Sequence, residues 1–120
     1  MKNIIRIATR NSPLALEQAK MVSSILSKHN KIEIVSMVSS GDKVSSKEFK
    51  IHGGKGLFLK ELEESLLRGD TDIAVHSLKD VPVILENKFS ITTISNRENP
   101  CDAFISKKYK TINDLPADAT

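Results

Sequence analysis

A lysine and an aspartate stand side by side where an apolar segment ends, and they are the first candidates for chemistry. Lys79 and Asp80 follow the apolar residues 73–75 and precede Pro82. Proline cannot donate to a strand ladder and restricts Val81 to extended conformations, so a strand must end here. Open α/β sheets bind ligands at the carboxyl ends of their strands. The pair therefore indicates a site for a charged small molecule; the alternative is an exposed ion pair worth about 0 to 1 kcal/mol.

Two other segments also end on charged or hydroxyl side chains. Arg10 follows residues 4–9 and stands two positions before Ser12. A guanidinium can hold a planar carboxylate with two parallel hydrogen bonds, which favours carboxylate binding. A surface arginine beside a helix-capping serine explains the pair equally well. Asp42 closes the turn Ser40-Gly41-Asp42, where a local Asx role is the simpler interpretation.

Glycines surround a lysine just before a helical pattern, in Gly53-Gly54-Lys55-Gly56. Backbone N–H groups, a helix N-terminus and the ammonium of Lys55 can together bind a carboxylate or phosphate. The segment is not a P-loop, because the order Gly-Lys-Ser/Thr is missing and no strand immediately precedes it. Anion binding and a purely structural hinge remain equal alternatives.

His76 and Cys101 are weaker candidates. His76 lies within the apolar run and has no metal-binding partners at ligand spacing, so we expect a core or rim histidine and no metal site. Cys101 has no base placed near it by the sequence and is interpreted as an ordinary thiol. As the single cysteine, it excludes an intramolecular disulfide and a cysteine-built zinc site.

The elements that position these residues alternate between strand and helix. The patterns predict strands over residues 4–9, 31–38, 73–77 and 89–94, and helices over residues 13–28 and 57–68. Ser12 suits the N-cap of the first helix and Pro13 its first position. This order implies right-handed crossovers and a mostly parallel sheet. Arg10, Asp42 and Asp80 should then converge on one edge.

Each predicted helix carries one apolar stripe that should cover the sheet. The stripes consist of Ala15, Ala19, Val22 and Leu26 in the first helix, and of Leu59, Leu62 and Leu66 in the second. Gly69 and Asp70 should end the second helix. Near the C-terminus, Thr111 and Asp114 form a partial capping box that predicts a weak helix start.

Composition restricts the class of protein. With 39% hydrophobic and 28% charged residues, the 120-residue chain is typical of a globular domain. No apolar run approaches the roughly 20 residues that span a bilayer, and the N-terminus reaches a charged residue too early for a signal peptide. We therefore expect a cytoplasmic protein with no membrane contact. The net charge of +3 comes from scattered lysines with only 4% aromatics, which favours small anions over nucleic acid.

Several long motifs, in order and at matching spacing, closely resemble porphobilinogen deaminase, also called hydroxymethylbilane synthase. The motifs lie at residues 7–15, 40–42, 53–58 and 74–82, and residues 97–104 are similar to the family's crossover between its first two domains. The resemblance implies an enzyme that condenses four porphobilinogen molecules into hydroxymethylbilane, releasing ammonia each time, in tetrapyrrole (haem) biosynthesis. It also implies a covalent dipyrromethane cofactor as primer.

The resemblance assigns roles to single residues. Asp80 would be the catalytic carboxylate, contacting pyrrole N–H groups and stabilising the cationic azafulvene that forms when ammonia leaves. Lys79, Arg10 and Ser12 would hold the acetate and propionate groups of cofactor or substrate. The remaining implied site residues are Lys55 and Phe58, at a loop and helix start over the cleft, and Asp42, near the cofactor.

The resemblance further implies a three-domain fold whose two α/β domains are like type II periplasmic binding proteins. We expect residues 1–98 to form the first domain without its returning strand, and residues 99–120 to form the hinge and the beginning of the second. The cofactor cysteine would lie outside this chain, because Cys101 does not match its position. We expect a monomeric full-length enzyme and an inactive isolated fragment.

Two alternatives stay open at this stage. A binding module without chemistry would bind an anion reversibly, and Asp80→Asn would leave that binding largely intact. A structural or regulatory fragment would pair with a partner that supplies the missing strand, since an exposed parallel edge makes such pairing plausible.

Overall fold

In the part of the chain that the structure describes, a parallel sheet with one helix on each face carries most of the candidate site residues. In the computed structural model, the described residues are 4–39, 58–92 and 96–119. The strands are β1 (Ile4–Arg10), β2 (Lys31–Met37) and β3 (Ile73–Ala74), and the helices are α1 (Pro13–Leu26) and α4 (Lys60–Arg68). Two 3₁₀ turns follow, η1 (Leu78–Asp80) and η2 (Ile112–Asp114).

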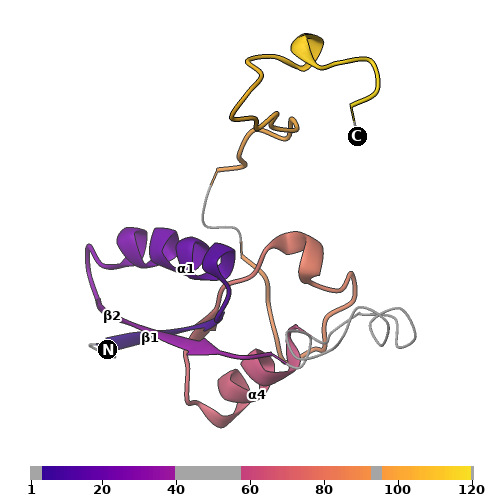
Figure 1. Ribbon diagram of the computed structural model, residues 1–120. Helices are drawn as coiled ribbons and strands as arrows, with labels where there is room; N and C mark the ends of the chain where they lie inside the picture. The colour runs from indigo at the N-terminus through magenta and orange to yellow at the C-terminus, as the bar shows by residue number, and fades with distance from the viewer. Residues whose placement is uncertain (1–3, 40–57, 93–95, 120) are drawn as a thin grey trace.

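The strand order within the described residues is β2-β1-β3, and both pairings are parallel. Ile4 pairs with Lys31 at the start of the β1–β2 ladder, and Ile7 pairs with Ile73 between β1 and β3. The central strand β1 is buried from Ile7 to Thr9. Figure 1 shows α1 on one side of the sheet and α4 on the other. The predicted α/β architecture with a mostly parallel sheet is therefore confirmed.

Helix α1 begins where its cap predicts. Ser12 has extended backbone angles, and its Oγ accepts a hydrogen bond from the Ala15 N–H at 3.3 Å, with Pro13 following as the first helical residue. Ala15, Ala19 and Val22 are buried against the sheet, as the stripe predicts. The helix ends at Leu26, two residues before the predicted end at residue 28, because the chain turns there and the His29 N–H binds the Leu26 carbonyl.

Helix α4 covers the opposite face. Leu59 and Leu62 are buried, which confirms the predicted apolar side for these two leucines. The helix starts at Lys60, three residues later than predicted, since residues 58 and 59 form a turn and residue 57 lies outside the described ranges. Gly69 ends it with a φ of +74°, a conformation that glycine adopts without steric cost.

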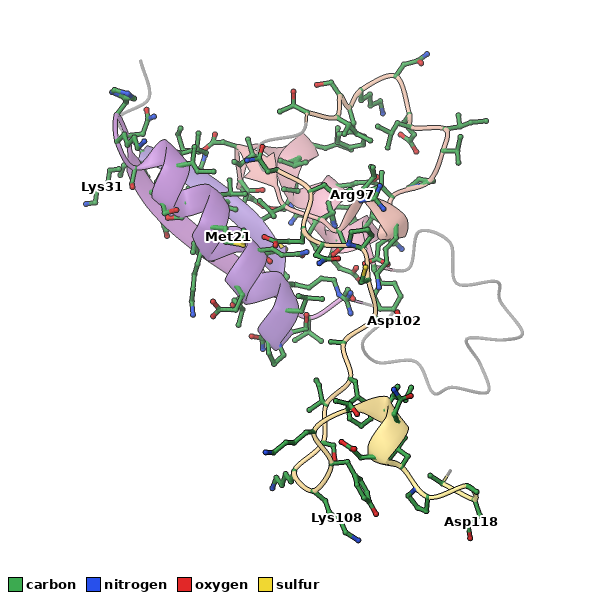
Figure 2. All side chains as sticks on the ribbon, turned by 90° about the horizontal axis from the view of Figure 1, so that it is seen from above. Met21, Lys31, Arg97, Asp102, Lys108 and Asp118 are labelled. Carbon is green, nitrogen blue, oxygen red and sulfur yellow. The ribbon has the colours of Figure 1, made fainter. Side chains whose placement is uncertain are left out.

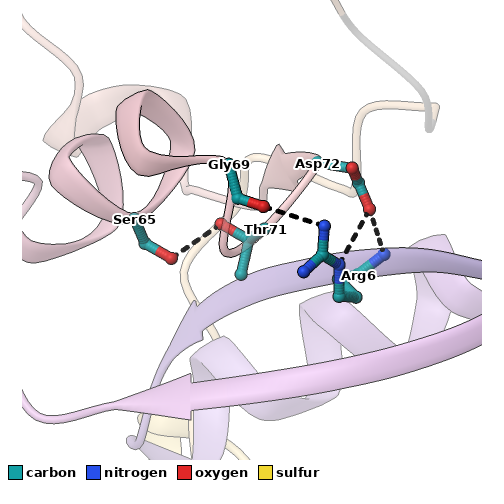
Figure 3. A network of polar contacts seen from close by, with 5 residues as sticks. All are labelled: Arg6, Ser65, Gly69, Thr71 and Asp72. Carbon is teal, nitrogen blue, oxygen red and sulfur yellow. Dashed lines mark hydrogen bonds and ion pairs between the residues drawn. The ribbon is translucent and has the colours of Figure 1, made fainter.

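A polar network ties β1 to the connection between α4 and β3 (Figure 3). The Asp72 carboxylate accepts from the Arg6 backbone N–H at 2.9 Å and from its Nε at 3.3 Å, while Arg6 Nη2 donates to the Gly69 carbonyl at 2.9 Å. The buried hydroxyls of Ser65 and Thr71 bind each other at 2.9 Å. These contacts fix the amino ends of two neighbouring strands, at the edge opposite to the candidate site.

Two strand predictions need correction. The third strand, predicted over residues 73–77, is paired as a strand only at Ile73 and Ala74, because the segment after it bends into η1. The fourth strand, predicted over residues 89–94, is wrong for its described part: residues 89–92 form no strand, and Ile91 is exposed. Alternation alone did not form a strand, because residues 89–92 pair with none of the described strands. Residues 93 and 94 lie outside the described ranges.

Residues 96–119 are almost entirely exposed. Their one regular element is η2, where the predicted capping box is present: the Asp114 carboxylate accepts from the Thr111 N–H at 2.8 Å. The turn is only three residues long, so the predicted helix start does not continue as a helix. Figure 2 shows Lys108 and Asp118 lying away from Met21 of α1. Neither α1 nor α4 has the length and apolar character that a membrane crossing requires.

Candidate functional site

The strand order of the described sheet reverses direction between β1 and β3. From β1 the chain crosses to β2 on one side, and from β2 it returns past β1 to β3 on the other side. Ligands of open α/β sheets bind at this reversal, outside the carboxyl ends of the strands. Arg10 ends β1, and the segment that carries His76 and Asp80 leaves β3 at the same edge. Two of the predicted strand ends therefore meet at the reversal.

A small hollow is present at this edge. Its lining residues are Arg10, Ser12, Leu14, Ala15, Gln18, Val75, His76, Ser77 and Asp80. Its volume of ≈ 30 Å³ exceeds the roughly 10–15 Å³ that a cavity needs to hold one water molecule. The hollow can therefore admit a small polar group such as one carboxylate.

The structure brings together some of the predicted site residues. Arg10, Ser12 and Asp80 line the same hollow, and Phe58 contacts Arg10 from outside it. Lys79 is exposed and does not line the hollow. The two remaining predicted residues, Asp42 and Lys55, lie outside the described ranges.

Phe58 holds the guanidinium of Arg10 in place. The Arg10 Cζ lies 4.0 Å from the centroid of the Phe58 ring, which is cation–π geometry. Phe58 stands just before α4, so this contact joins the end of β1 to the start of the opposite helix. An arginine held this way keeps its planar donors directed and loses less side-chain entropy when an anion binds.

Asp80 is presented by the η1 turn. Its backbone N–H donates to the Ser77 carbonyl at 3.0 Å, and the Val81 N–H donates to the Leu78 carbonyl at 3.1 Å. The exposed ion pair considered for Lys79 and Asp80 is absent from the described residues, whose ion pairs lie elsewhere. Asp80 is a half-buried residue and lines the hollow together with Arg10.

His76 is a half-buried rim residue of the hollow, as predicted. Burial lowers the pKa of its imidazole below the ordinary 6.5, the Asp80 carboxylate opposes that by raising the pKa, and the Arg10 guanidinium lowers it further. The imidazole is therefore neutral at pH 7 and adds no charge. Asp80 and Arg10 remain the charged pair that faces a ligand.

Sequence reasoning missed the pair Gln18 and Ser77. Gln18 Nε2 donates to Ser77 Oγ at 2.9 Å. The Ser77 hydroxyl can in turn donate to Gln18 Oε1 at 3.1 Å. A signal was present, because Gln18 stands three residues after Ala15 and four before Val22, on the buried face of α1. A polar side chain on that stripe needs a polar partner.

A larger open hollow of ≈ 470 Å³ lies in the C-terminal segment, between residues 102–104 and 110–112. None of the predicted site residues lines it, and its lining residues Phe104 and Ile112 are exposed. The smaller hollow is the chemically better candidate, because it combines a cation, a hydroxyl and a carboxylate. Among the described residues, no group of histidine, cysteine, aspartate and glutamate side chains is arranged to hold a metal ion.

Fold and site together define an α/β protein with a polar, anion-compatible crevice at the carboxyl edge of a parallel sheet. Residues 5–120 match the protein family described as porphobilinogen deaminase, dipyromethane cofactor binding domain. Curated relatives named porphobilinogen deaminase are 48% identical over 122 residues in Ruthia magnifica subsp. Calyptogena magnifica and 47% identical over 119 residues in Campylobacter hominis. The matches cover 99% and 98% of this chain, and 40% and 39% of the relatives.

The chain belongs to the porphobilinogen deaminase family. It spans about 40% of the length of the curated relatives it matches.

Proposed function

We propose that this chain supplies the catalytic carboxylate, Asp80, of a porphobilinogen deaminase. The whole enzyme would condense four porphobilinogen molecules into hydroxymethylbilane, with loss of ammonia at each addition, in tetrapyrrole (haem) biosynthesis. One observation carries the proposal: Arg10, Ser12 and Asp80, from segments about 70 residues apart in the sequence, line one hollow at the strand reversal.

Asp80 would act by electrostatic stabilisation. A carboxylate accepts hydrogen bonds from pyrrole N–H groups, and it favours the positive charge that develops on the pyrrole carbon framework as ammonia leaves. Presentation on a short turn, beside the neutral imidazole of His76, keeps this charge directed at the hollow. The protein does not need to transfer a proton from Asp80 for this role.

Arg10 and Ser12 would bind carboxylate groups of the substrate. Porphobilinogen carries an acetate and a propionate, and guanidinium and hydroxyl donors at the edge of the hollow match such groups. The Ser12 Oγ accepts the cap hydrogen bond from the Ala15 N–H, so its own O–H can donate to an anion. Lys79, exposed on η1, would contribute a cation outside the hollow.

The described residues fit the dipyrromethane cofactor that the family description names. A cation and a hydroxyl suit its carboxylates, and a carboxylate suits its pyrrole N–H groups. Arg10, Ser12 and Asp80 would hold it, with Phe58, Asp42 and Lys55 as further proposed contacts. When bound, the cofactor supplies the primer to which pyrrole units are added. Cys101 is exposed and does not line the hollow, which supports an attachment cysteine elsewhere.

We further propose the domain organisation. Residues 1–98 would be the first of two α/β domains of the type II periplasmic-binding-protein kind, and residues 99–120 the hinge and start of the second. The parallel order β2-β1-β3 and the exposure of residues 96–119 support this division. The whole enzyme would be a cytoplasmic monomer.

The test compares the 120-residue chain with the whole enzyme that contains it. Each is incubated with porphobilinogen, and hydroxymethylbilane and ammonia are measured. We expect product from the whole enzyme, with four ammonia released per hydroxymethylbilane, and none from the 120-residue chain, because the relatives are more than twice as long. Product from the short chain, or none from the whole enzyme, would overturn the proposal.

A further inference from the structure

Ser77 occupies an N-cap position without using its side chain as a cap. It precedes η1 with extended angles of φ −67° and ψ 130°, yet η1 has no side-chain cap hydrogen bond. Serine at such a position normally accepts from a backbone N–H of the following turn. Its hydroxyl instead binds the Gln18 amide at 2.9 and 3.1 Å. The side chain is therefore committed to α1 and not to the turn that it begins.

The backbone carbonyl of Ser77 also accepts a hydrogen bond from η1. The Asp80 N–H donates to this carbonyl at 3.0 Å. The only other backbone hydrogen bond within residues 77–81, all of which the structure describes, runs from the Val81 N–H to the Leu78 carbonyl. A three-residue 3₁₀ turn with two such bonds has little internal stability. Its position relative to the sheet must come from contacts at its ends.

Gln18 provides a rigid contact of that kind. It precedes Ala19, which is fully buried, and lies between the buried residues Ala15 and Val22 along the helix. The amide carries both a donor and an acceptor within hydrogen-bond distance of the Ser77 hydroxyl, so it can bind that hydroxyl in either role. It is also neutral, and therefore holds the segment without pairing with the charge of Asp80. An arginine or lysine here would compete with the ligand for that carboxylate.

We propose that Gln18 is a positioning residue that fixes the Asp80 turn through the hydroxyl of Ser77. This inference rests on the proposed function for its kinetic effect, because it assigns Asp80 the catalytic role. The helix that covers one face of the sheet thus sets where the carboxylate stands at the edge of that sheet.

The test uses Gln18→Met in the whole enzyme, which keeps side-chain length and removes the amide. Loss of one positioning hydrogen bond should lower kcat about tenfold and change KM less than about twofold. Ser77→Ala should lower kcat by a similar factor. Ser77→Thr, which keeps the hydroxyl, should retain most of the unaltered enzyme's kcat. Glu17→Gln is the matched control, since Glu17 is an exposed neighbour on α1 that pairs only with Lys20 among the described residues.

A double-mutant cycle distinguishes positioning from general destabilisation. If both residues act through one contact, the Gln18→Met/Ser77→Ala enzyme should be no slower than either single variant. Two changes that simply weaken the fold would add. Should Gln18→Met fail to fold, Gln18→Asn, whose shorter side chain draws the amide away from Ser77, takes its place in the cycle.

A second measurement needs no substrate. Asp80 raises the pKa of His76, so NMR titration of the His76 ring reports where that carboxylate stands. Gln18→Met should lower this pKa in the direction that Asp80→Asn lowers it, and Ser77→Thr should not. An unchanged His76 titration, additive losses in the cycle, or a raised KM with normal kcat would each overturn the positioning role. Because the titration is independent of turnover, it still decides the matter if the enzyme proves not to make hydroxymethylbilane.

Discussion

At the scale of single residues, the site combines one anion, one guanidinium and a neutral imidazole. Arg10, His76 and Asp80 line the same hollow, and His76 has a lowered pKa, chiefly because it is buried. The convergence of Arg10 and Asp80 was predictable, because each residue follows an apolar segment in an alternating strand and helix pattern. The roles of these residues in catalysis stay predictions.

His76 gives a prediction about pH. Its pKa in the folded protein lies below the ordinary 6.5, so the unfolded chain binds more protons between those two values. The stability of the fold should therefore fall as the pH drops through 6.5, and the loss should be complete below the folded pKa. Urea unfolding at pH 7.5 and 5.5 measures this. His76→Asn should reduce the difference between the two midpoints, and an equal difference in both proteins would contradict the assignment.

Some residue roles were not readable from local sequence. In the sequence, Gln18 is one polar position on an apolar helix face. The residues next to it do not indicate that its partner is Ser77, which lies 59 residues away. Lys79 and Asp80 are adjacent, yet the η1 turn exposes the first and directs the second to the hollow. Such directions depend on the turn that the chain forms after β3, which short-range patterns do not determine.

At the scale of elements, periodic patterns were reliable where the element pairs or packs along most of its length with another described element. β1, β2 and α1 were predicted within two residues at each end, because strand burial and helix stripes reflect contacts that these elements make. The predictions over residues 73–77 and 89–94 were too long or wrong, since pairing depends on an available strand edge. Alternating apolar and polar residues make a segment suitable for a strand. Whether a neighbouring strand is there to pair with it depends on the rest of the fold.

The network at the amino edge of the sheet gives the prediction at this scale. Asp72→Ala removes the carboxylate that accepts from the Arg6 backbone N–H and forms an ion pair with the Arg6 side chain. Both side chains are only partly exposed. We expect a loss of about 1 to 3 kcal/mol in the free energy of unfolding. Asp70→Ala is the control: Asp70 pairs with Arg68 at the exposed end of α4, so its loss should cost less than about 1 kcal/mol. Equal losses in urea melts would refute the distinction.

At the scale of the whole molecule, the described structure is extended for its length. The Cα radius of gyration is 18.1 Å, whereas a compact chain of this length has about 14 Å. The exposed segment 96–119 accounts for part of the difference, and it carries apolar side chains such as Phe104 and Ile105 on its surface. With relatives more than twice as long, this surface is consistent with the proposal that the segment begins a second domain.

The central claim is that the Asp80 carboxylate performs the chemistry. Asp80→Asn in the whole enzyme keeps the size and the η1 turn while removing the charge. We predict that kcat for hydroxymethylbilane formation falls about 10²- to 10³-fold, with porphobilinogen binding largely retained. An Asp80→Asn enzyme that forms hydroxymethylbilane at the unaltered rate would contradict the account.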